Sequence, residues 1–190
     1  IGMAVFSGCS SLASVIIPNS ITSISVATFH GCRNLKSVTI PNSVISIGEQ
    51  AFQDCINLFS VTIPNSVTNI EQRAFGSCGL TSVTIPNSVT NIEEGTFQNC
   101  FNLTSVSIPN GVKSIGPYSF YGCKELTSII VDTKEPLAIG QTVFSNCSKA
   151  ILYVPIGCKE AYMAADNWKD FKEIVEVAFG DADGDGDVTP

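Results

Sequence analysis

The chain has 190 residues, of which 44% are hydrophobic and 14% charged, and its formal net charge is −7. This composition can supply a buried core, but the apolar runs are far shorter than the roughly 20 residues that a membrane-spanning helix needs. The acidic balance, without a stripe of Lys and Arg, argues against a nucleic-acid partner. The chain opens inside a sequence repeat, so we expect a piece of a longer protein whose start and targeting signal lie upstream.

One pattern with a period of about 23 residues recurs seven times between residues 1 and 156. Each copy places a phenylalanine three residues before a cysteine. The seven pairs are Phe6/Cys9, Phe29/Cys32, Phe52/Cys55, Phe75/Cys78, Phe97/Cys100, Phe120/Cys123 and Phe144/Cys147. A fixed period in this range predicts a solenoid, in which stacked coils cover apolar residues that one coil cannot bury alone.

Each copy begins with a short alternating segment. In the second copy, Val38 and Ile40 alternate with Ser37 and Thr39, which is the period of a half-buried strand. The other apolar pairs are Val15/Ile17, Val61/Ile63, Val83/Ile85, Val106/Ile108, Ile129/Val131 and Leu152/Val154. In six of the seven copies a proline follows, which ends the strand because it cannot donate to the ladder. We expect parallel strands about 4.8 Å apart along one face.

The rest of each copy supplies further inward residues. A second apolar pair, Val44 and Ile47 in the second copy, precedes the phenylalanine and the cysteine. The phenylalanines should form an aromatic spine inside the side opposite the strands. The repeated cysteines should lie one coil apart with parallel side chains, which suits disulfide geometry poorly, so we expect buried free thiols. Cys158 lies outside the pattern, which leaves a bond to Cys147 open.

The repeats contain no pattern of residues typical of a catalytic site. The single histidine, His30, follows a repeat phenylalanine at a position that is serine, glutamine, glycine or tyrosine elsewhere, which indicates a solvent-facing loop. Glu93 and Glu94 fall in a variable stretch and are interpreted as solvated surface. With no phosphate loop, nucleophile motif or metal-ligand cluster in the repeats, we expect neither an enzyme nor a cofactor there.

The outward strand positions form an uncharged, hydroxyl-rich face. Small Ser and β-branched Thr suit an exposed strand, and the same face could dock a protein or a glycan. The candidate ligand-binding residues are Ser37, Thr39, Phe59, Ser60, Thr62, Ser82, Thr84, Ser105, Ser107 and Tyr153. Phe59 stands where other copies have Lys36, Thr81, Thr104 or Thr127, so it is either a contact residue or part of a variable edge.

The periodicity stops after Pro155, and residues 157–178 are expected to cap the solenoid. The pattern predicts an amphipathic helix from Lys159 to Ala165 and a final strand over Phe171–Val177. A solenoid must cover its last open coil, so we interpret Trp168 as a structural lid.

Residues 179–190 are strongly acidic and begin the D-x-D-x-D-G pattern of a calcium loop. Asp181, Asp183 and Asp185 would be ligands through carboxylates, and Asp187 through its carbonyl. The twelfth loop position lies beyond Pro190, so we expect this site to be empty unless the loop is completed downstream. The alternative is an acidic tail.

The order Leu-x-x-Val-x-Ile-Pro, then Phe-x-x-Cys-x-x-Leu, over residues 1–156 resembles the BspA-like leucine-rich repeats of bacterial surface proteins. The resemblance implies a leucine-rich-repeat solenoid with short parallel strands on one face, a loop-rich opposite face and a small helix-plus-strand C-terminal cap. Ser43, Ser66 and Ser88 stand where the general repeat places asparagine, which argues against a buried asparagine ladder. Residues 179–190 resemble the first loop of a dockerin module.

The resemblance also implies a function. It suggests a non-catalytic, monomeric recognition or adhesion module, secreted or on a bacterial cell surface, that binds host or microbial protein or glycan. Two alternatives remain open. One is a structural spacer on the cell surface, and the other is an accessory subunit of a secreted polysaccharide-degrading assembly that docks through a completed calcium module.

Overall fold

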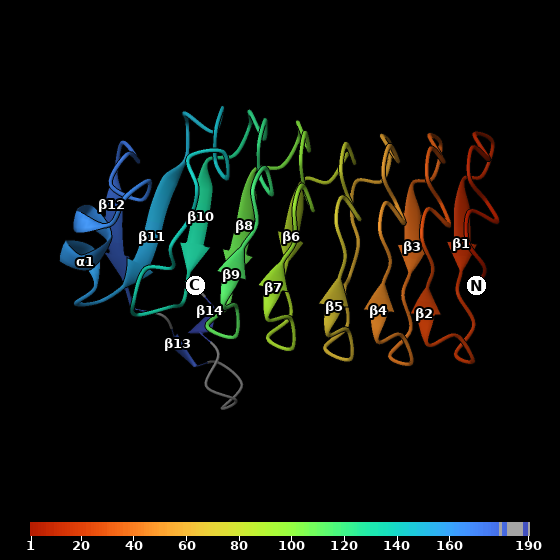
Figure 1. Ribbon diagram of the computed structural model, residues 1–190, viewed down its shortest axis with the longest axis horizontal. Helices are drawn as coiled ribbons and strands as arrows, with labels where there is room; N and C mark the ends of the chain where they lie inside the picture. The colour runs from red at the N-terminus through yellow and green to blue at the C-terminus, as the bar shows by residue number, and fades with distance from the viewer. Residues whose placement is uncertain (179, 182–187, 190) are drawn as a thin grey trace.

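The computed structural model shows one stack of coils, as the repeats predict, and describes residues 1–178, 180–181 and 188–189 (Figure 1). One long side of the stack carries the main strands. They are β1 (Ser14–Ile16), β3 (Ser37–Thr39), β6 (Ser82–Thr84), β8 (Ser105–Ile108), β10 (Ser128–Val131), β11 (Ile151–Pro155) and β12 (Ile174–Val177). The predicted parallel solenoid is therefore confirmed, with a single short helix among the described residues.

The main strands pair in parallel at a register that matches the sequence repeat. Ser82 lies beside Ser105, and Ser105 lies beside Ser128. Strands β6, β8, β10, β11 and β12 form one sheet, while β1 and β3 form a separate pair. The prediction of a full strand at Val61–Ile63 is wrong, because this coil makes only an isolated bridge between Thr39 and Thr62. The following coil is one residue shorter before its strand, which interrupts the ladder here.

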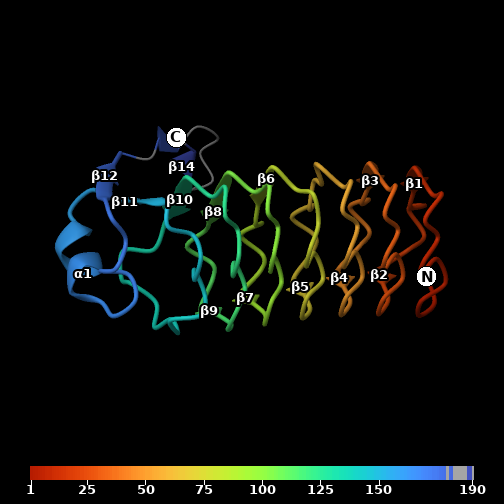
Figure 2. The same cartoon turned by 90° about the horizontal axis from the view of Figure 1, so that it is seen from above.

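A second series of strands, which the sequence pattern did not predict, runs along the other long side (Figure 2). Its members have two residues each: β2 (Ser23–Ile24), β4 (Ser46–Ile47), β5 (Asn69–Ile70), β7 (Asn91–Ile92) and β9 (Ser114–Ile115). Their isoleucines are the second members of the inner apolar pairs, and all are buried. Strands β2, β4 and β5 pair with one another and β7 pairs with β9, whereas β5 and β7 do not pair, so the second series also has a gap between the third and fourth coils.

The repeat phenylalanines form the expected aromatic spine. Successive rings from Phe6 to Phe144 are stacked, with centroids 5.2 to 5.7 Å apart and nearly parallel planes. The five rings from Phe29 to Phe120 are completely buried. At the C-terminal end, Phe144 meets Trp168 and Phe171 in tilted and edge-on contacts, which end the stack.

All eight cysteines are free, and all except Cys9 are buried, which agrees with the predicted thiols. The bond left open between Cys147 and Cys158 is not formed. Six repeat thiols donate to the carbonyl oxygen of the phenylalanine in the preceding coil, with Sγ···O distances of 3.0 to 3.3 Å. The pairs are Cys32–Phe6, Cys55–Phe29, Cys78–Phe52, Cys100–Phe75, Cys123–Phe97 and Cys147–Phe120. Cysteine therefore supplies both small size and a donor at this position.

Serine links the coils where the general repeat would have asparagine. The hydroxyls of Ser43, Ser66 and Ser88 donate to backbone carbonyl oxygens of the preceding coil, at 2.6 to 2.7 Å. These bonds occupy backbone acceptors that the turn after the proline would otherwise leave unpaired.

The C-terminal segment covers the last coil. Helix α1 (Lys159–Ala164) ends one residue before the predicted limit, and β12 begins at Ile174 because Phe171 turns inward against Phe144. Trp168 is completely buried and its indole Nε1 donates to the Leu137 carbonyl oxygen at 2.7 Å. Beyond this cap, β13 (Gly180–Asp181) and β14 (Val188–Thr189) pair antiparallel.

Candidate binding surface

The predicted ligand-binding residues of the main strands lie in rows that the parallel register creates. Ser82 and Ser105 belong to one row, and Thr84 and Ser107 belong to the next. The members on the first four coils are exposed: Ser37, Thr39, Ser60, Thr62, Ser82 and Thr84. Ser105, Ser107 and Tyr153 are half-buried. The structure thus brings these side chains onto one surface, which we call the strand face.

The strand face changes character toward the C-terminus. Ile130 and Tyr153 continue the threonine row onto β10 and β11, and Val175 of β12 continues it further. These three side chains are half-buried. At the other end, Ile16 of β1 lies beside Thr39 and is 84% exposed, so the strand face is hydroxyl-rich along its middle coils and apolar at both ends. The residue pattern already indicated this difference at Ile16, Ile130 and Tyr153.

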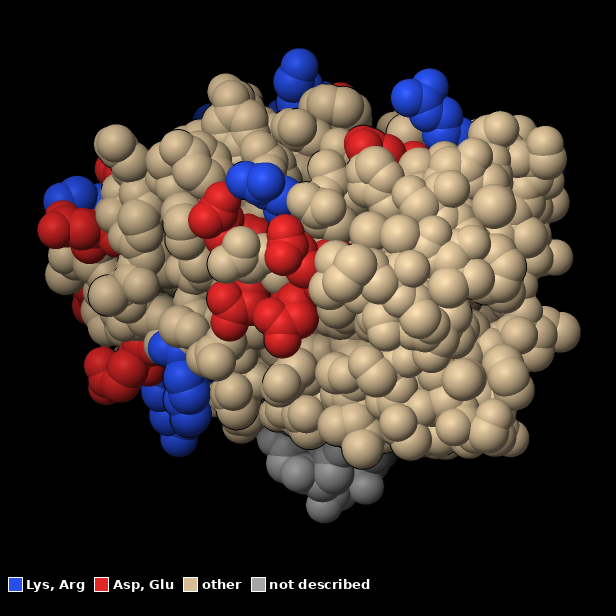
Figure 3. All heavy atoms as spheres, turned by 45° about the vertical axis from the view of Figure 1, so that its right-hand side comes forward, with Lys and Arg blue, Asp and Glu red and all other residues tan. Residues whose placement is uncertain are grey.

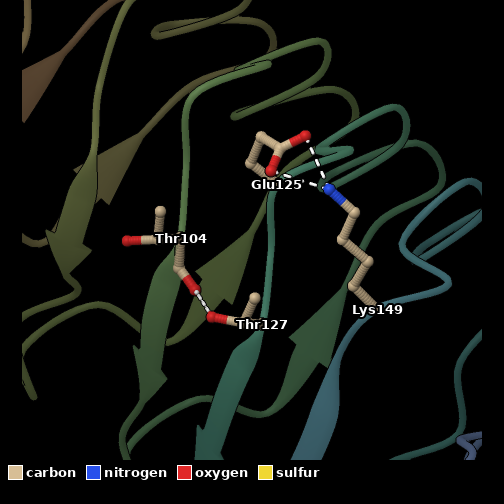
Figure 4. A network of polar contacts seen from close by, with 4 residues as sticks. All are labelled: Thr104, Glu125, Thr127 and Lys149. Carbon is tan, nitrogen blue, oxygen red and sulfur yellow. Dashed lines mark hydrogen bonds and ion pairs between the residues drawn. The ribbon is translucent and has the colours of Figure 1, made fainter.

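Phe59 belongs to a different column, at the edge where each coil enters its main strand. Its successors are Thr81, Thr104 and Thr127. The hydroxyl of Thr104 donates to the Thr81 carbonyl oxygen at 2.9 Å. The hydroxyl of Thr127 donates to the Thr104 carbonyl oxygen at 3.1 Å, as drawn in Figure 4. These two hydroxyls therefore already donate hydrogen bonds within the chain.

The same edge carries exposed apolar side chains, of which the sequence pattern indicated Phe59 but not Ile56 or Phe101. Ile56, Phe59 and Phe101 are 49%, 44% and 52% exposed. Between them in the stack stands Gly79, whose coil has one residue between Cys78 and its leucine where the others have two. The shortened spacing between cysteines was the sequence feature that could have indicated this irregular edge.

Charged side chains are unevenly distributed. Figure 3 shows acidic side chains gathered around a basic one near the middle of one face, beside a broad surface without charged groups. On neighbouring coils, Glu71 and Glu93 line a small polar hollow, and Glu94 accepts from Arg73 at 2.9 Å. Glu93 and Glu94 are half-buried. Among the described residues, no three His, Cys, Asp or Glu side chains are grouped to hold a metal ion.

The remaining candidates occupy surface positions or lie outside the description. His30 is half-exposed, with its Nε2 3.5 Å from the Asp54 carboxylate, itself partly exposed. Asp183, Asp185 and Asp187 lie outside the described residues, and of Asp181 only the backbone is described, as part of β13. The calcium-loop prediction therefore stays a prediction. In the part of the chain that is described, no helix is long and apolar enough to cross a membrane.

Comparison with known proteins identifies the repeat. A family model for the BspA type leucine rich repeat region matches in six copies, over residues 1–76 and 46–165. No curated protein matches the chain.

Solved structures share the fold. A leucine-rich repeat protein from Bacteroides ovatus superimposes with a TM-score of 0.68 at 24% identity, over 94% of this chain and 59% of that one. A leucine-rich repeat protein from T. pallidum gives 0.66 at 28% identity, over 75% and 68%. The pneumococcal vaccine antigen PcpA gives 0.68 at 22% identity, over 87% and 42%. The chain thus spans little more than half of the Bacteroides protein and less than half of PcpA.

Proposed function

The chain belongs to the BspA-type leucine-rich repeat family, and from this premise we propose that it is a non-catalytic recognition module of a secreted or cell-surface bacterial protein. Its ligand is a protein or a glycan of a host or of another microbe, and its role is adhesion. A pneumococcal vaccine antigen among the structural neighbours supports a location outside the cell.

The observation that carries this proposal is the uncharged strand face. From Ser14 on β1 to Tyr153 on β11, every outward strand position is Ser, Thr, Ile or Tyr. Charged residues are depleted in the centres of protein interfaces because their desolvation is costly. A broad face that combines small hydroxyls with apolar side chains at its two ends loses little on desolvation and can pair with amide or sugar hydroxyl groups.

The test is a binding screen of the immobilised chain against extracellular-matrix proteins and a glycan array. A variant with Thr39→Glu and Thr84→Glu places charge on the strand face, and Thr68→Glu with Thr90→Glu, both exposed beside the second strand series, is the matched control. We expect selective, saturable binding that only the strand-face variant loses. Equal loss in both variants, or no ligand in the screen, would contradict the proposal.

A structural spacer is the second candidate, and the unbroken aromatic spine favours it. Stacked rings from Phe6 to Phe144 give a core that continues through all seven repeats, as a rod requires. If the chain is a spacer, removing coils should shorten the distance that a neighbouring domain can span, while the strand-face variant should have no effect on that distance.

The accessory-subunit alternative depends on a calcium loop outside the described residues and predicts calcium-dependent docking only for a longer chain.

A further inference from the structure

The fourth coil interrupts the otherwise regular edge of the solenoid. Its single residue between Cys78 and Leu80 is Gly79. A Cβ atom at this position would lie 2.4 Å from the Ile56 carbonyl oxygen, which no real side chain tolerates. The edge therefore has one place where the backbones of two coils meet closely and no side chain projects.

Apolar side chains border this place on both sides. A Cβ atom at position 79 would lie 3.3 Å from Cδ1 of Phe59, so the Phe59 ring lies beside the glycine. Ile56 precedes Gly79 in its column of the stack, and Phe101 follows it. We call Ile56, Phe59 and Phe101 the notch patch. About half of each side chain is exposed, and these are three of the chain's large exposed hydrophobic residues.

Basic residues flank the notch patch along the stack. One coil earlier, Arg33 and Lys36 occupy the positions of Ile56 and Phe59, and the Arg33 carbonyl oxygen accepts from Asn57 at 2.8 Å. One coil later, Lys124 follows Phe101 in its column, with its ammonium 5.6 Å from the ring centroid. All three basic residues are exposed.

Two acidic groups follow the same columns of the stack. Glu125 accepts two hydrogen bonds from the Lys149 ammonium, at 2.8 and 2.7 Å, and Figure 4 draws this pair. Asp54 lies 3.5 Å from Nε2 of His30, a contact that is an ion pair only when the imidazole is protonated. Arg33, Lys36 and Lys124 outnumber the one remaining carboxylate, so the edge that holds the notch patch keeps a positive balance, although the whole chain has a net charge of −7.

We propose that the notch patch binds an extended, acidic peptide segment of a partner protein. Gly79 itself is buried, so an apolar side chain of the peptide packs against the exposed sides of Phe59 and Phe101, and carboxylates at its two ends face Arg33 with Lys36 and Lys124. The inference rests on the proposed recognition function and adds a partner class at the edge of the strand face. A peptide fits better than an anionic glycan, because a glycan has no apolar side chain to cover three exposed hydrophobic residues.

The geometry sets the length of the peptide. Lys36 and Lys124 are four coils apart, which is roughly 19 Å at 4.8 Å per coil. An extended chain rises about 3.3 Å per residue, so its two acidic positions should be about six residues apart. The apolar residue should lie midway between them.

The experiment measures binding of fluorescent synthetic peptides by polarisation. The first peptide has aspartates at this spacing around a central leucine in a serine background. The second replaces the aspartates with lysine, and the third replaces the leucine with serine. We expect the first peptide to bind most tightly, and added salt to weaken it, because exposed charges are screened.

Matched variants of the chain locate the contact. Phe59→Ser with Phe101→Ser should weaken binding by about tenfold, the usual scale for losing an aromatic anchor. Lys36→Glu with Lys124→Glu should weaken it similarly without touching any buried residue. Ile45→Ser, equally exposed on the other strand series, and Lys113→Glu are the controls.

Four outcomes would overturn the inference. They are the absence of binding by every peptide, binding of the lysine peptide as tight as that of the aspartate peptide, equal losses in the control variants, and tighter binding of a sulfated glycan than of any peptide. If no peptide binds while the chain keeps a strand-face ligand, the notch-patch inference fails and the proposed function stands. If the strand-face ligand is absent but the acidic peptide binds as described, the strand face is the part that fails.

Discussion

At the scale of single residues, the repeated cysteine is the side chain whose role the structure explains best. Its thiol is buried beside the phenylalanine spine and donates to a carbonyl oxygen of the preceding coil. Burial raises the pKa of these thiols, to about 12 for Cys55 and Cys100 and about 11 for Cys147. The thiols are therefore protonated and unreactive at neutral pH, because the thiolate is the nucleophile.

These pKa shifts predict a loss of stability in alkaline solution. The folded chain keeps thiol protons that the unfolded chain releases above about pH 9, so the stabilisation is complete below that pH. It is lost as the pH rises toward the folded-state values of about 11 and 12. Each thiol contributes a decline of about 1.4 kcal/mol per pH unit. Urea unfolding with reductant at about pH 8 and about pH 10.5 would measure it.

The variant Cys100→Ala provides the control for the alkaline loss. It removes one titrating thiol, whose pKa is raised mainly by burial. The free energy of unfolding should therefore fall less steeply with pH in this variant than in the parent chain. Parallel pH dependences for the two proteins would contradict the assigned cause.

At the scale of the elements, the spine and the two strand series hold neighbouring coils together. The spine and the main strands could be predicted because their residues repeat at fixed spacing and have clear strand or core chemistry. The second strands could not, because two residues are too short to show alternation. The left-handed turns could not be predicted from the sequence either, because Gln50, Arg73 and Tyr118 adopt positive φ at positions where no glycine indicates such a turn.

The candidate site was predicted less completely than the fold. Alternation placed the serines and threonines of the strand face correctly, because a period of two directs side chains to one side of a sheet. Phe59 was visible as a departure from its column. Ile56 and Phe101 were not, because they belong to other coils and only Gly79 brings them together around one place.

Removing one ring from the middle of the spine should be costly. Phe75 is completely buried and stacks on Phe52 and Phe97 at 5.3 and 5.7 Å. Phe75→Ala should lower the free energy of unfolding by about 3–5 kcal/mol, because it leaves a cavity that two rigid neighbours do not fill. Urea unfolding would measure the loss. Phe101→Ala, at a half-exposed ring, should cost much less, and equal losses would count against the spine as the main core element.

At the scale of the whole molecule, the two ends of the stack differ. The C-terminal coil is covered by α1, Trp168 and β12, whereas apolar residues of the first coil, such as Phe6 and Leu12, are only partly buried. In a stack where each coil contacts only its neighbours, stability depends on how well each coil is covered. In a chain limited to residues 1–190, opening should therefore begin at the first coil, and the cap should protect the last.

Hydrogen exchange can test this order directly. Amide protection should be lowest in the first coil and rise toward the middle coils. Trp168→Ala should lower stability by about 3–5 kcal/mol and reduce protection mainly in β10 and β11, because the buried indole seals that end. Uniform loss of protection along the whole stack would show instead that the coils unfold as one unit.

For the proposed adhesion role, in which the protein bridges two surfaces, the free thiols have a mechanical consequence. No covalent bond joins one coil to the next, since all eight cysteines are unlinked. Under tension the stack can therefore come apart one turn at a time from an end. Each released turn of 23 residues lengthens the tether by about 75 Å, given about 3.3 Å per extended residue. The solenoid would then lengthen under force as its coils unfold. A disulfide-linked rod would keep its length and transmit the full force to its attachment points.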